Sequence, residues 1–203
     1  MLKFLDNCQE ESIFQLVFLV YKLFSMIIEQ SLKQFYKDNG LPENGGEDKD
    51  FFELEVKPFT LKLPNPEFRK KVIHIHDIEH VLYNCDISWK GESFIAGWEI
   101  ATGFWKVLPI GILSLSTMGI GLFLYPKEVL KGFKNGINTT GIIDLKLSRE
   151  ELLKFETSAL RNYIKKEETK KVNWFSFLFW CFISEFVLLF PLFILIGFII
   201  WIF

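Results

Sequence analysis

The sequence predicts an all-α protein: a helical domain that holds a metal ion in a helix–loop–helix, followed by a C-terminal transmembrane helix. Three observations lead to this prediction. Helix-type hydrophobic spacing, with residues that start and stop helices, recurs along the 203-residue chain. Two histidines four residues apart stand beside carboxylates in one such segment. Residues 174–203 carry a single charge.

The composition limits the classes of partner. Apolar residues make up 50% of the chain and charged residues 24%, which is typical of a protein with a packed core. The net charge of −2 gives no basic surface, so a nucleic-acid partner is not expected. The three cysteines are far apart in the sequence, which fits a reducing compartment.

Residues 1–40 are predicted to form an amphipathic N-terminal helix. Ser12 followed by Gln15 is a capping-box pattern, and the dense apolar positions after it end at Asn39-Gly40. Two interpretations are open, because periodicity does not separate them. The helix either packs on the core of the domain or lies on a membrane surface.

Residues 41–64 are predicted to be a linker and a short extended segment. The stretch 37–50 is polar and glycine-rich, as surface linkers are. Residues 51–63 alternate weakly between apolar and polar side chains, with Pro58 in the middle, so we expect at most a short edge segment.

The metal-binding helical domain is predicted over residues 65–168. Residues 65–67 combine a capping asparagine, a proline for the first helical position and an acid for the first turn. The helix that they start should run to a break at Asn84, and the next helix should begin near Ser88.

Three further segments complete this domain. Residues 107–126 are uncharged and just long enough to span a bilayer, but their glycine, serine and proline content fits a core helix or a helix dipping into a membrane equally well. Residues 127–137 are basic and amphipathic. Residues 148–166 predict one helix, with a serine cap, an acidic first turn and a basic last turn.

A C-terminal membrane anchor is predicted over residues 172–203. From Trp174 onward the chain contains one charge, Glu185, and one proline, Pro191. A continuous helix of this length would measure about 45 Å against a hydrocarbon core of about 30 Å, so one tilted or kinked span fits. The basic residues just before it should hold that side in the cytoplasm or its topological equivalent; they are Arg161, Lys165, Lys166, Lys170 and Lys171.

A metal site is predicted where the histidines occur. In a helix, His76 and His80 lie one turn apart on one face, so both imidazoles can reach one ion. Asp77 can reach the same point, and Glu92, in the first turn of the next helix, would return opposite His80. Two nitrogens and two carboxylates suit zinc, and also iron or manganese. The lack of a thiolate favours a catalytic site over a structural one.

The metal site has an alternative explanation, because two histidines at this spacing also occur by chance. The neighbouring His74 is expected at the surface. Glu99 follows Glu92 by two helical turns, so it is either a hydrogen-bond partner of a metal-binding histidine or an ordinary helix glutamate.

The same five residues also fit the inverzincin pattern H-x-x-E-H of certain metallopeptidases. Glu79 would then be the general base, and a distant glutamate such as Glu156 the third ligand. The chain is short for such a peptidase, which makes this the weakest of the readings.

The run from His76 to His80, followed after eleven residues by Glu92, resembles the H-D-x-x-H…E signature of the Coq-four family of ubiquinone (coenzyme Q) biosynthesis proteins. The stretch HDIEHVLYNCDISWKGESFIAGWEIATG is similar to bacterial members, in which a short aspartate-containing loop, G-E and a W-E helix follow the motif. The segments 107–126, YPKEVLKGFKNG and EELLKFETSALRNYI stand in the family's order. The resemblance covers roughly residues 50–166.

This resemblance implies a helical, zinc-binding protein whose ligands are His76, Asp77, His80 and Glu92. It implies a metal-dependent carboxy-lyase that removes the ring carboxylate of a polyprenylated 4-hydroxybenzoate-type precursor. The alternative is a lipid-binding scaffold that organises other quinone-synthesis enzymes around a structural metal. The implied location is the bacterial or mitochondrial inner membrane, with the soluble domain on the cytoplasmic or matrix side.

The expected partners are therefore membrane lipid or a polyprenyl-quinone precursor, and other quinone-synthesis enzymes; a homodimer is left open. Carbon dioxide would leave when a proton or an oxidant attacks the ring carbon that bears the carboxylate. Asp77 and Glu92 are the catalytic candidates, because either carboxylate could leave the metal and carry a proton. The chain departs from the mitochondrial pattern in lacking a recognisable P-x-G-T-L-G segment and in adding the apolar tail 174–203.

Overall fold

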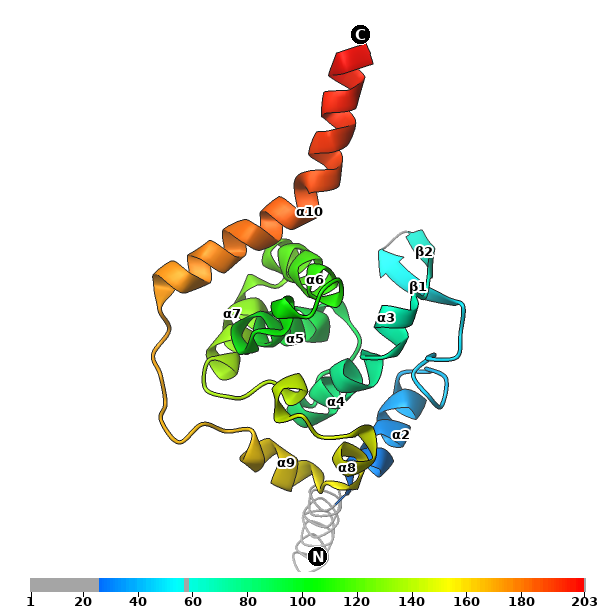
Figure 1. Ribbon diagram of the computed structural model, residues 1–203, viewed down its shortest axis with the longest axis vertical. Helices are drawn as coiled ribbons and strands as arrows, with labels where there is room; N and C mark the ends of the chain where they lie inside the picture. Colours follow the sequence, from blue (N-terminus) through cyan, green and yellow to red (C-terminus); the bar gives the residue numbers. More distant parts are fainter. Residues whose placement is uncertain (1–25, 57–58, 203) are drawn as a thin grey trace, which may run out of the picture.

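The computed structural model describes residues 26–56 and 59–202. Most of this part of the chain is helical, and its one sheet is a two-stranded ribbon, so the all-α prediction is confirmed (Figure 1). The elements, in chain order, are α2 (Ile28–Asp38), β1 (Phe51–Val56), β2 (Phe59–Pro64), α3 (Glu67–Lys70), α4 (Ile73–Tyr83), α5 (Trp89–Thr102), the 3₁₀ helix η1 (Phe104–Lys106), α6 (Ile110–Leu124), α7 (Pro126–Gly136), the 3₁₀ helix η2 (Ile142–Leu145), α8 (Arg149–Lys154), α9 (Thr157–Tyr163) and α10 (Trp174–Ile202).

Helix α5 lies in the middle of the domain and is buried on nearly every side (Figure 1). Its N-terminal cap is Ser88, and Gly103 ends it in the left-handed conformation. One hydrophobic cluster joins α5 to α2, α4, α8 and α9, and a second joins it to α6, α7 and α10. The helix that carries Glu92 and Glu99 is therefore fixed by both halves of the core.

Two glycines allow α5 and α7 to approach closely. A Cβ added at Gly97 would clash with the carbonyl oxygen of Val129, and one added at Gly132 would clash with that of Phe94. Because the backbones touch at these points, the interface leaves no room for a side chain.

Helix α2 is a core helix over its described length. Ile28, Leu32 and Tyr36 point into the first hydrophobic cluster and are buried. The helix ends at Asp38, close to the predicted Asn39-Gly40 stop. The rest of the predicted helix over residues 1–40 lies outside the described residues.

The predicted edge segment at 51–63 is instead an antiparallel ribbon in which β1 pairs with β2. The helix predicted from residue 65 is interrupted at 71–72, which separates α3 from α4. Asn65 does not cap α3, because its side-chain amide donates to the carbonyl oxygens of Gly46 (3.1 Å) and Lys49 (2.9 Å). This asparagine ties the loop before β1 to the start of α3.

The single helix predicted over residues 148–166 is two helices, α8 and α9. Phe155 and Glu156 between them are extended. Two backbone hydrogen bonds hold them there: the amide of Ile28 donates to the carbonyl oxygen of Phe155 (2.8 Å), and the amide of Thr157 donates to the carbonyl oxygen of Met26 (2.9 Å). The predicted serine cap is present, since Ser148 forms a capping box that starts α8. Docking of the α2 N-terminus thus breaks the helix.

Helix α6 covers most of the uncharged segment 107–126. Its 15 residues measure about 22 Å, which is short of the bilayer core of about 30 Å. It packs on α5 and on the first part of α10, where Gly119 lies against the backbone oxygen of Ser184. The segment therefore forms a packed helix rather than a full transmembrane span.

Helix α10 has 29 residues and is long and apolar enough to cross a membrane. Figure 1 shows that it first lies across the domain beside α6, then bends and projects away. Pro191 lies inside the helix and lacks the amide hydrogen that the ladder needs, which accounts for a bend. Residues 191–202 are all exposed.

Candidate metal centre

Three of the predicted ligands meet between α4 and α5. The Nε2 atoms of His76 and His80 lie 3.2 Å apart. Glu92 reaches both rings, with Oε2 at 3.6 Å from Nε2 of His76 and Oε1 at 3.4 Å from Nε2 of His80. These buried or half-buried groups form a cluster that could hold a metal ion.

The three side chains lie close enough together to share one ion. Zinc bonds of about 2.0–2.1 Å at tetrahedral angles place neighbouring ligand atoms about 3.3–3.4 Å apart. The two Nε2 atoms, 3.2 Å apart, are close to this spacing, and each oxygen of Glu92 approaches one of the rings, at 3.4 and 3.6 Å. One ligand atom from each of the three residues lies within 4.8 Å of the others, so one ion could contact all three side chains.

The other nitrogen of each histidine is held by a hydrogen bond. His76 Nδ1 lies 3.0 Å from Oε1 of Glu99, and His80 Nδ1 lies 3.3 Å from the carbonyl oxygen of Cys85. Both partners can accept, so each Nδ1 can donate and each ring, when neutral, offers the lone pair of Nε2 to a metal. The two Nε2 atoms face each other at 3.2 Å, so an ion between them would contact both rings. The Glu99 partnership suggested by its spacing is thus present.

In the metal-free state His76 and Glu92 shift each other's pKa toward the charged form. Burial lowers the pKa of His76, but the carboxylates of Glu99 and Glu92 outweigh it and hold that pKa well above 6.5. Burial raises the pKa of Glu92, but His80 and His76 outweigh it and hold that pKa well below 4.5. The shifts favour the charged forms of both groups, so without a metal His76 and Glu92 attract each other as an ion pair.

The cluster lies at the edge of the core. The side chain of His80 is 1% exposed, whereas those of His76 and Glu92 are 25% and 24% exposed. The two outer ligands therefore keep part of their surface open to solvent, while His80 lies in the interior. A partly open position of this kind is typical of catalytic rather than structural metal sites.

Asp77, the fourth predicted ligand, lies beside the cluster but is not part of it in this structure. Its Oδ2 accepts a hydrogen bond from the hydroxyl of Tyr36 (2.9 Å), and Gly45 packs against the same oxygen. Burial raises the pKa of Asp77, while the nearby His76 and His80 lower it in part. The sequence pattern did not indicate Tyr36, which α2 brings from 41 residues away.

Glu79 lies on the opposite side of His76 from Glu92. It forms a second cluster with Glu99 and the His76 ring, and neither of its carboxylate oxygens has a hydrogen-bond partner among the groups that the structure describes. Burial and the neighbouring Glu99 raise the pKa of Glu79 well above 4.5. Glu79 thus belongs to a different group from that of His76, His80 and Glu92, whereas the metallopeptidase alternative needs it as a base at the ion.

The remaining candidate residues lie elsewhere. Glu156 is exposed and accepts from the hydroxyl of Ser158 (2.8 Å), so it belongs to neither cluster. His74, expected at the surface, is half-buried, and its Nδ1 has no hydrogen-bond partner among the described groups. Burial lowers the pKa of His74.

Comparison of the chain with protein-family models, with curated proteins and with solved structures finds no match.

Proposed function

We propose that the protein is a membrane-attached metalloenzyme that removes the ring carboxylate of a polyprenylated 4-hydroxybenzoate-type precursor. Zinc is the proposed ion, and iron and manganese suit the same ligands. The observation that carries the proposal is the convergence of His76, His80 and Glu92 on one point between α4 and α5, within the range at which they could share an ion. The H-D-x-x-H…E motif supports the quinone-precursor substrate.

A divalent ion in this cluster supplies Lewis acidity and a template for oxygen ligands of the substrate. The surrounding residues supply the rest. Glu99 orients the ring of His76, and the carbonyl of Cys85 orients that of His80. Asp77 adjoins His76 in the chain, and its carboxylate accepts a hydrogen bond from Tyr36. In the proposed reaction the bond between the ring carbon and the carboxylate breaks and carbon dioxide leaves. The electron pair stays on the ring carbon, and a proton carried by Asp77 or Glu92 takes the place of the carboxylate.

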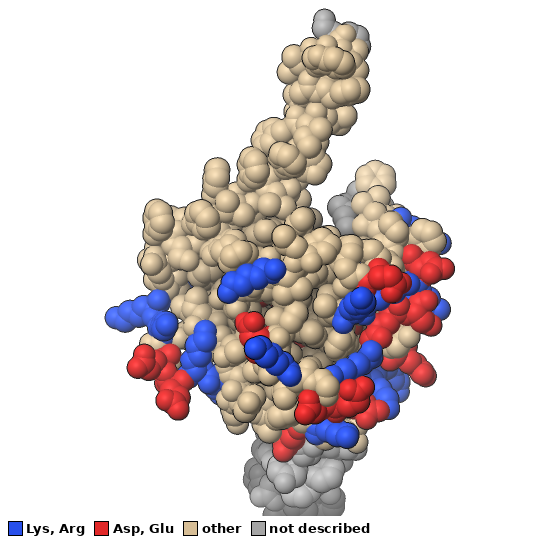
Figure 2. Space-filling model, in the orientation of Figure 1, with Lys and Arg blue, Asp and Glu red and all other residues tan. Residues whose placement is uncertain are grey.

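A membrane setting is supported by the distribution of apolar side chains. Figure 2 shows that the part of the molecule formed by α6 and α10 presents no charged side chains on the visible face, while charges gather on the lower part. The large exposed apolar residues of this region, outside residues 191–202, include Leu108, Ile112, Leu113, Phe123, Leu124, Phe175, Leu178, Phe179, Phe182 and Phe186. An apolar patch of this size on a protein surface marks a binding surface, and a continuous apolar helix next to it favours lipid.

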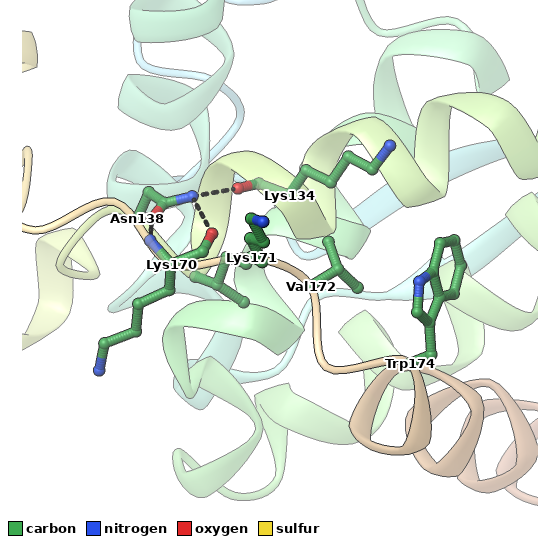
Figure 3. A pocket seen from close by; sticks show the side chains of 7 residues that line it. Lys134, Asn138, Lys170, Lys171, Val172 and Trp174 are labelled. Carbon is green, nitrogen blue, oxygen red and sulfur yellow. Dashed lines mark hydrogen bonds between the residues drawn. The ribbon is translucent and has the colours of Figure 1, made fainter.

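A basic edge supports the orientation of this surface. Between α7 and the chain that leads into α10 lies a cavity of about 480 Å³, lined in part by Lys134, Lys170 and Lys171, with Trp174 at one end (Figure 3). Asn138 holds the linker there through hydrogen bonds with the backbones of Lys134 and Lys170. Lysines and a tryptophan at the start of an apolar helix are typical of the headgroup level on the cytoplasmic side.

A scaffold function is the second candidate. It is favoured by one observation: the ligands come from two helices, α4 and α5, and His80 is 1% exposed, so a metal would also pin these helices together. In that case the protein would bind the lipid precursor and other quinone-synthesis enzymes without turnover.

Release of carbon dioxide separates the two candidates. Metal-loaded protein in liposomes would be incubated with a carboxyl-labelled prenylated 4-hydroxybenzoate, with and without oxygen. The enzyme proposal predicts labelled carbon dioxide that disappears with a chelator and in His80→Ala, but persists in the control His74→Ala. Tight binding of the lipid with no release under zinc, iron or manganese would reject the enzyme and favour the scaffold.

A further inference from the structure

The guanidinium of Arg69 is half-buried on α3 with few partners. Its Nη1 donates to Oδ1 of Asn65 (3.0 Å), and its plane lies over the ring of Phe52, 4.1 Å from the centroid. Among the side chains that the structure describes, no carboxylate forms an ion pair with it. A guanidinium has five N–H donors, so most of those of Arg69 remain free for another group.

A short chain of contacts connects Arg69 to the metal centre. Asn65, its hydrogen-bond partner, also donates to the carbonyl of Gly46 (3.1 Å). The preceding Gly45 packs against Oδ2 of Asp77, since a Cβ added there would lie 2.6 Å from that oxygen. Arg69 and Asp77 therefore flank the same loop, and Asp77 adjoins His76 in α4.

The electrostatics agree with this placement. Burial lowers the pKa of Arg69, and the carboxylates of Asp77 and Glu92 act in the opposite direction. Neither carboxylate forms an ion pair with the guanidinium among the described side chains. A half-buried guanidinium next to the loop that packs on Asp77 is a suitable partner for an anionic group of a ligand that also reaches the metal.

We infer that Arg69 binds the carboxylate of an aromatic acid substrate, with the ring of that substrate directed toward the point between His76, His80 and Glu92. This inference rests on the proposed function and names the residue that recognises the acid. The planar fork of a guanidinium matches a carboxylate with two parallel hydrogen bonds. Asn65 and Phe52 would fix the fork in advance, so little side-chain freedom is lost when the acid binds.

Arg69 also has a structural contact, because its stacking on Phe52 joins α3 to the β1–β2 ribbon. The test must therefore measure something that a loosened ribbon would not change. The preference for an acid over the matched phenol is such a measure, since both ligands share the ring and the prenyl group.

The test uses zinc-loaded full-length protein in detergent and calorimetric titration with prenylated 4-hydroxybenzoate and with the same prenylated phenol lacking the carboxylate. Arg69→Met should weaken binding of the acid about 10- to 100-fold and leave that of the phenol unchanged, because a hydrogen-bonded charge contact is lost. Arg69→Lys should restore part of the preference. The control Lys71→Met removes an exposed cation two residues away and should change neither affinity. Metal content should stay at the wild-type level in all three variants.

Several results would overturn the inference. They are equal affinity of the wild-type protein for acid and phenol, no measurable binding of the acid, or equal weakening of both ligands in Arg69→Met. Tighter binding of a prenyl phosphate than of the acid, lost in Arg69→Met, would reject the carboxylate as the recognised group. If the wild-type protein holds no metal, the proposed function fails instead, so the two failures are distinguishable.

Discussion

Each histidine of the metal centre has its Nδ1 engaged in a hydrogen bond, which leaves Nε2 as the ligand atom. His76 uses the carboxylate of Glu99 and His80 uses the backbone of Cys85. A carboxylate behind a histidine raises the basicity of the ring and fixes its orientation. The His76 side of the centre is therefore the side that a single substitution can weaken without removing a ligand.

Replacing Glu99 by glutamine tests this role. The amide still offers an oxygen to His76 but no longer carries the charge, so we expect Glu99→Gln to weaken zinc affinity about 10-fold or more. Competition with a chromophoric chelator measures it. His74→Ala, on the same helix as His76 but outside the cluster, should keep the wild-type affinity. Unchanged affinity in Glu99→Gln would show that the hydrogen bond does not tune the metal.

The raised pKa of His76 predicts that metal binding releases protons. The shift favours the charged imidazole in the metal-free protein, and the metal must displace its proton. Affinity should therefore rise with pH until the pH passes the raised pKa. Calorimetry at pH 7 in two buffers of different ionisation enthalpy measures the protons released. A heat of binding that is the same in both buffers would contradict the prediction.

The same shifts set the stability of the metal-free protein. The pKa of His76 is higher in the folded than in the unfolded protein, so its charge stabilises the fold fully below a pH of about 6.5, and this stabilisation is lost as pH rises through the folded-state pKa. The pKa of Glu92 is lower in the folded than in the unfolded protein, so its charge stabilises the fold above a pH of about 4.5, and this stabilisation is lost as pH falls through the folded-state pKa. The metal-free protein should accordingly be most stable between these limits.

At the residue scale, helical spacing was enough to predict which side chains lie together. It placed His76 and His80 on one face of α4, and it placed Glu99 on the face of α5 that carries Glu92. Tyr36 and Arg69 were not predicted, because their place beside the centre depends on how α2 and α3 pack. Asp77 remains a predicted ligand; its hydrogen bond to Tyr36 comes from a tertiary contact that no local pattern contains.

At the element scale, α5 determines whether the centre holds together, because it carries both Glu92 and Glu99 between the two clusters of the core. Its contact with α7 depends on backbone approach at Gly97 and Gly132. Substitutions at this interface therefore affect the metal centre without touching it.

Gly132→Ala reverses the usual effect of alanine in a helix. Alanine is normally favoured over glycine by about 1 kcal/mol, but here the added methyl group clashes with the carbonyl of Phe94. We expect a net loss of about 1–3 kcal/mol in the free energy of unfolding, measured by denaturant unfolding in detergent. Gly197→Ala, which meets nothing within 4 Å, is the control and should cause no loss. Equal stability of the two variants would show that α5 and α7 are not in close contact.

The element boundaries were predictable where the signals are local. The Ser88 and Ser148 caps mark helix starts that the structure has. The break at Phe155 was not predictable, because partners distant in sequence hold the extended backbone there. The β1–β2 ribbon was underestimated for a related reason: a weak alternation around a proline does not reveal that each half pairs with the other.

At the scale of the whole molecule, α10 has two parts with different surroundings. The first part covers α6 and places Phe177 in the second hydrophobic cluster, 5.1 Å from the ring of Phe133. Residues 191–202 are exposed along their whole length and project from the domain (Figure 1). Only the second part is free of contacts that the domain needs for stability.

Two truncations distinguish these parts. Removing residues 192–203 should leave thermal stability of the domain unchanged and shift protein from the membrane to the soluble fraction, because residues 191–202 are exposed. Removing residues 174–203 should also lower the melting temperature, since it uncovers the second cluster. Fractionation and thermal unfolding of both measure this. If the protein that lacks only the end of α10 stays fully in the membrane fraction, the apolar surface of α6 is the main anchor instead.

The most direct test of the central claim is the metal content of the purified full-length protein, measured by mass spectrometry together with that of five variants. We predict one divalent ion per chain, lost in His76→Ala and His80→Ala and strongly reduced in Glu92→Ala. His74→Ala and Glu79→Ala should keep it. Wild-type protein without stoichiometric metal, or metal lost in Glu79→Ala but kept in Glu92→Ala, would contradict the assignment of His76, His80 and Glu92 as the metal centre.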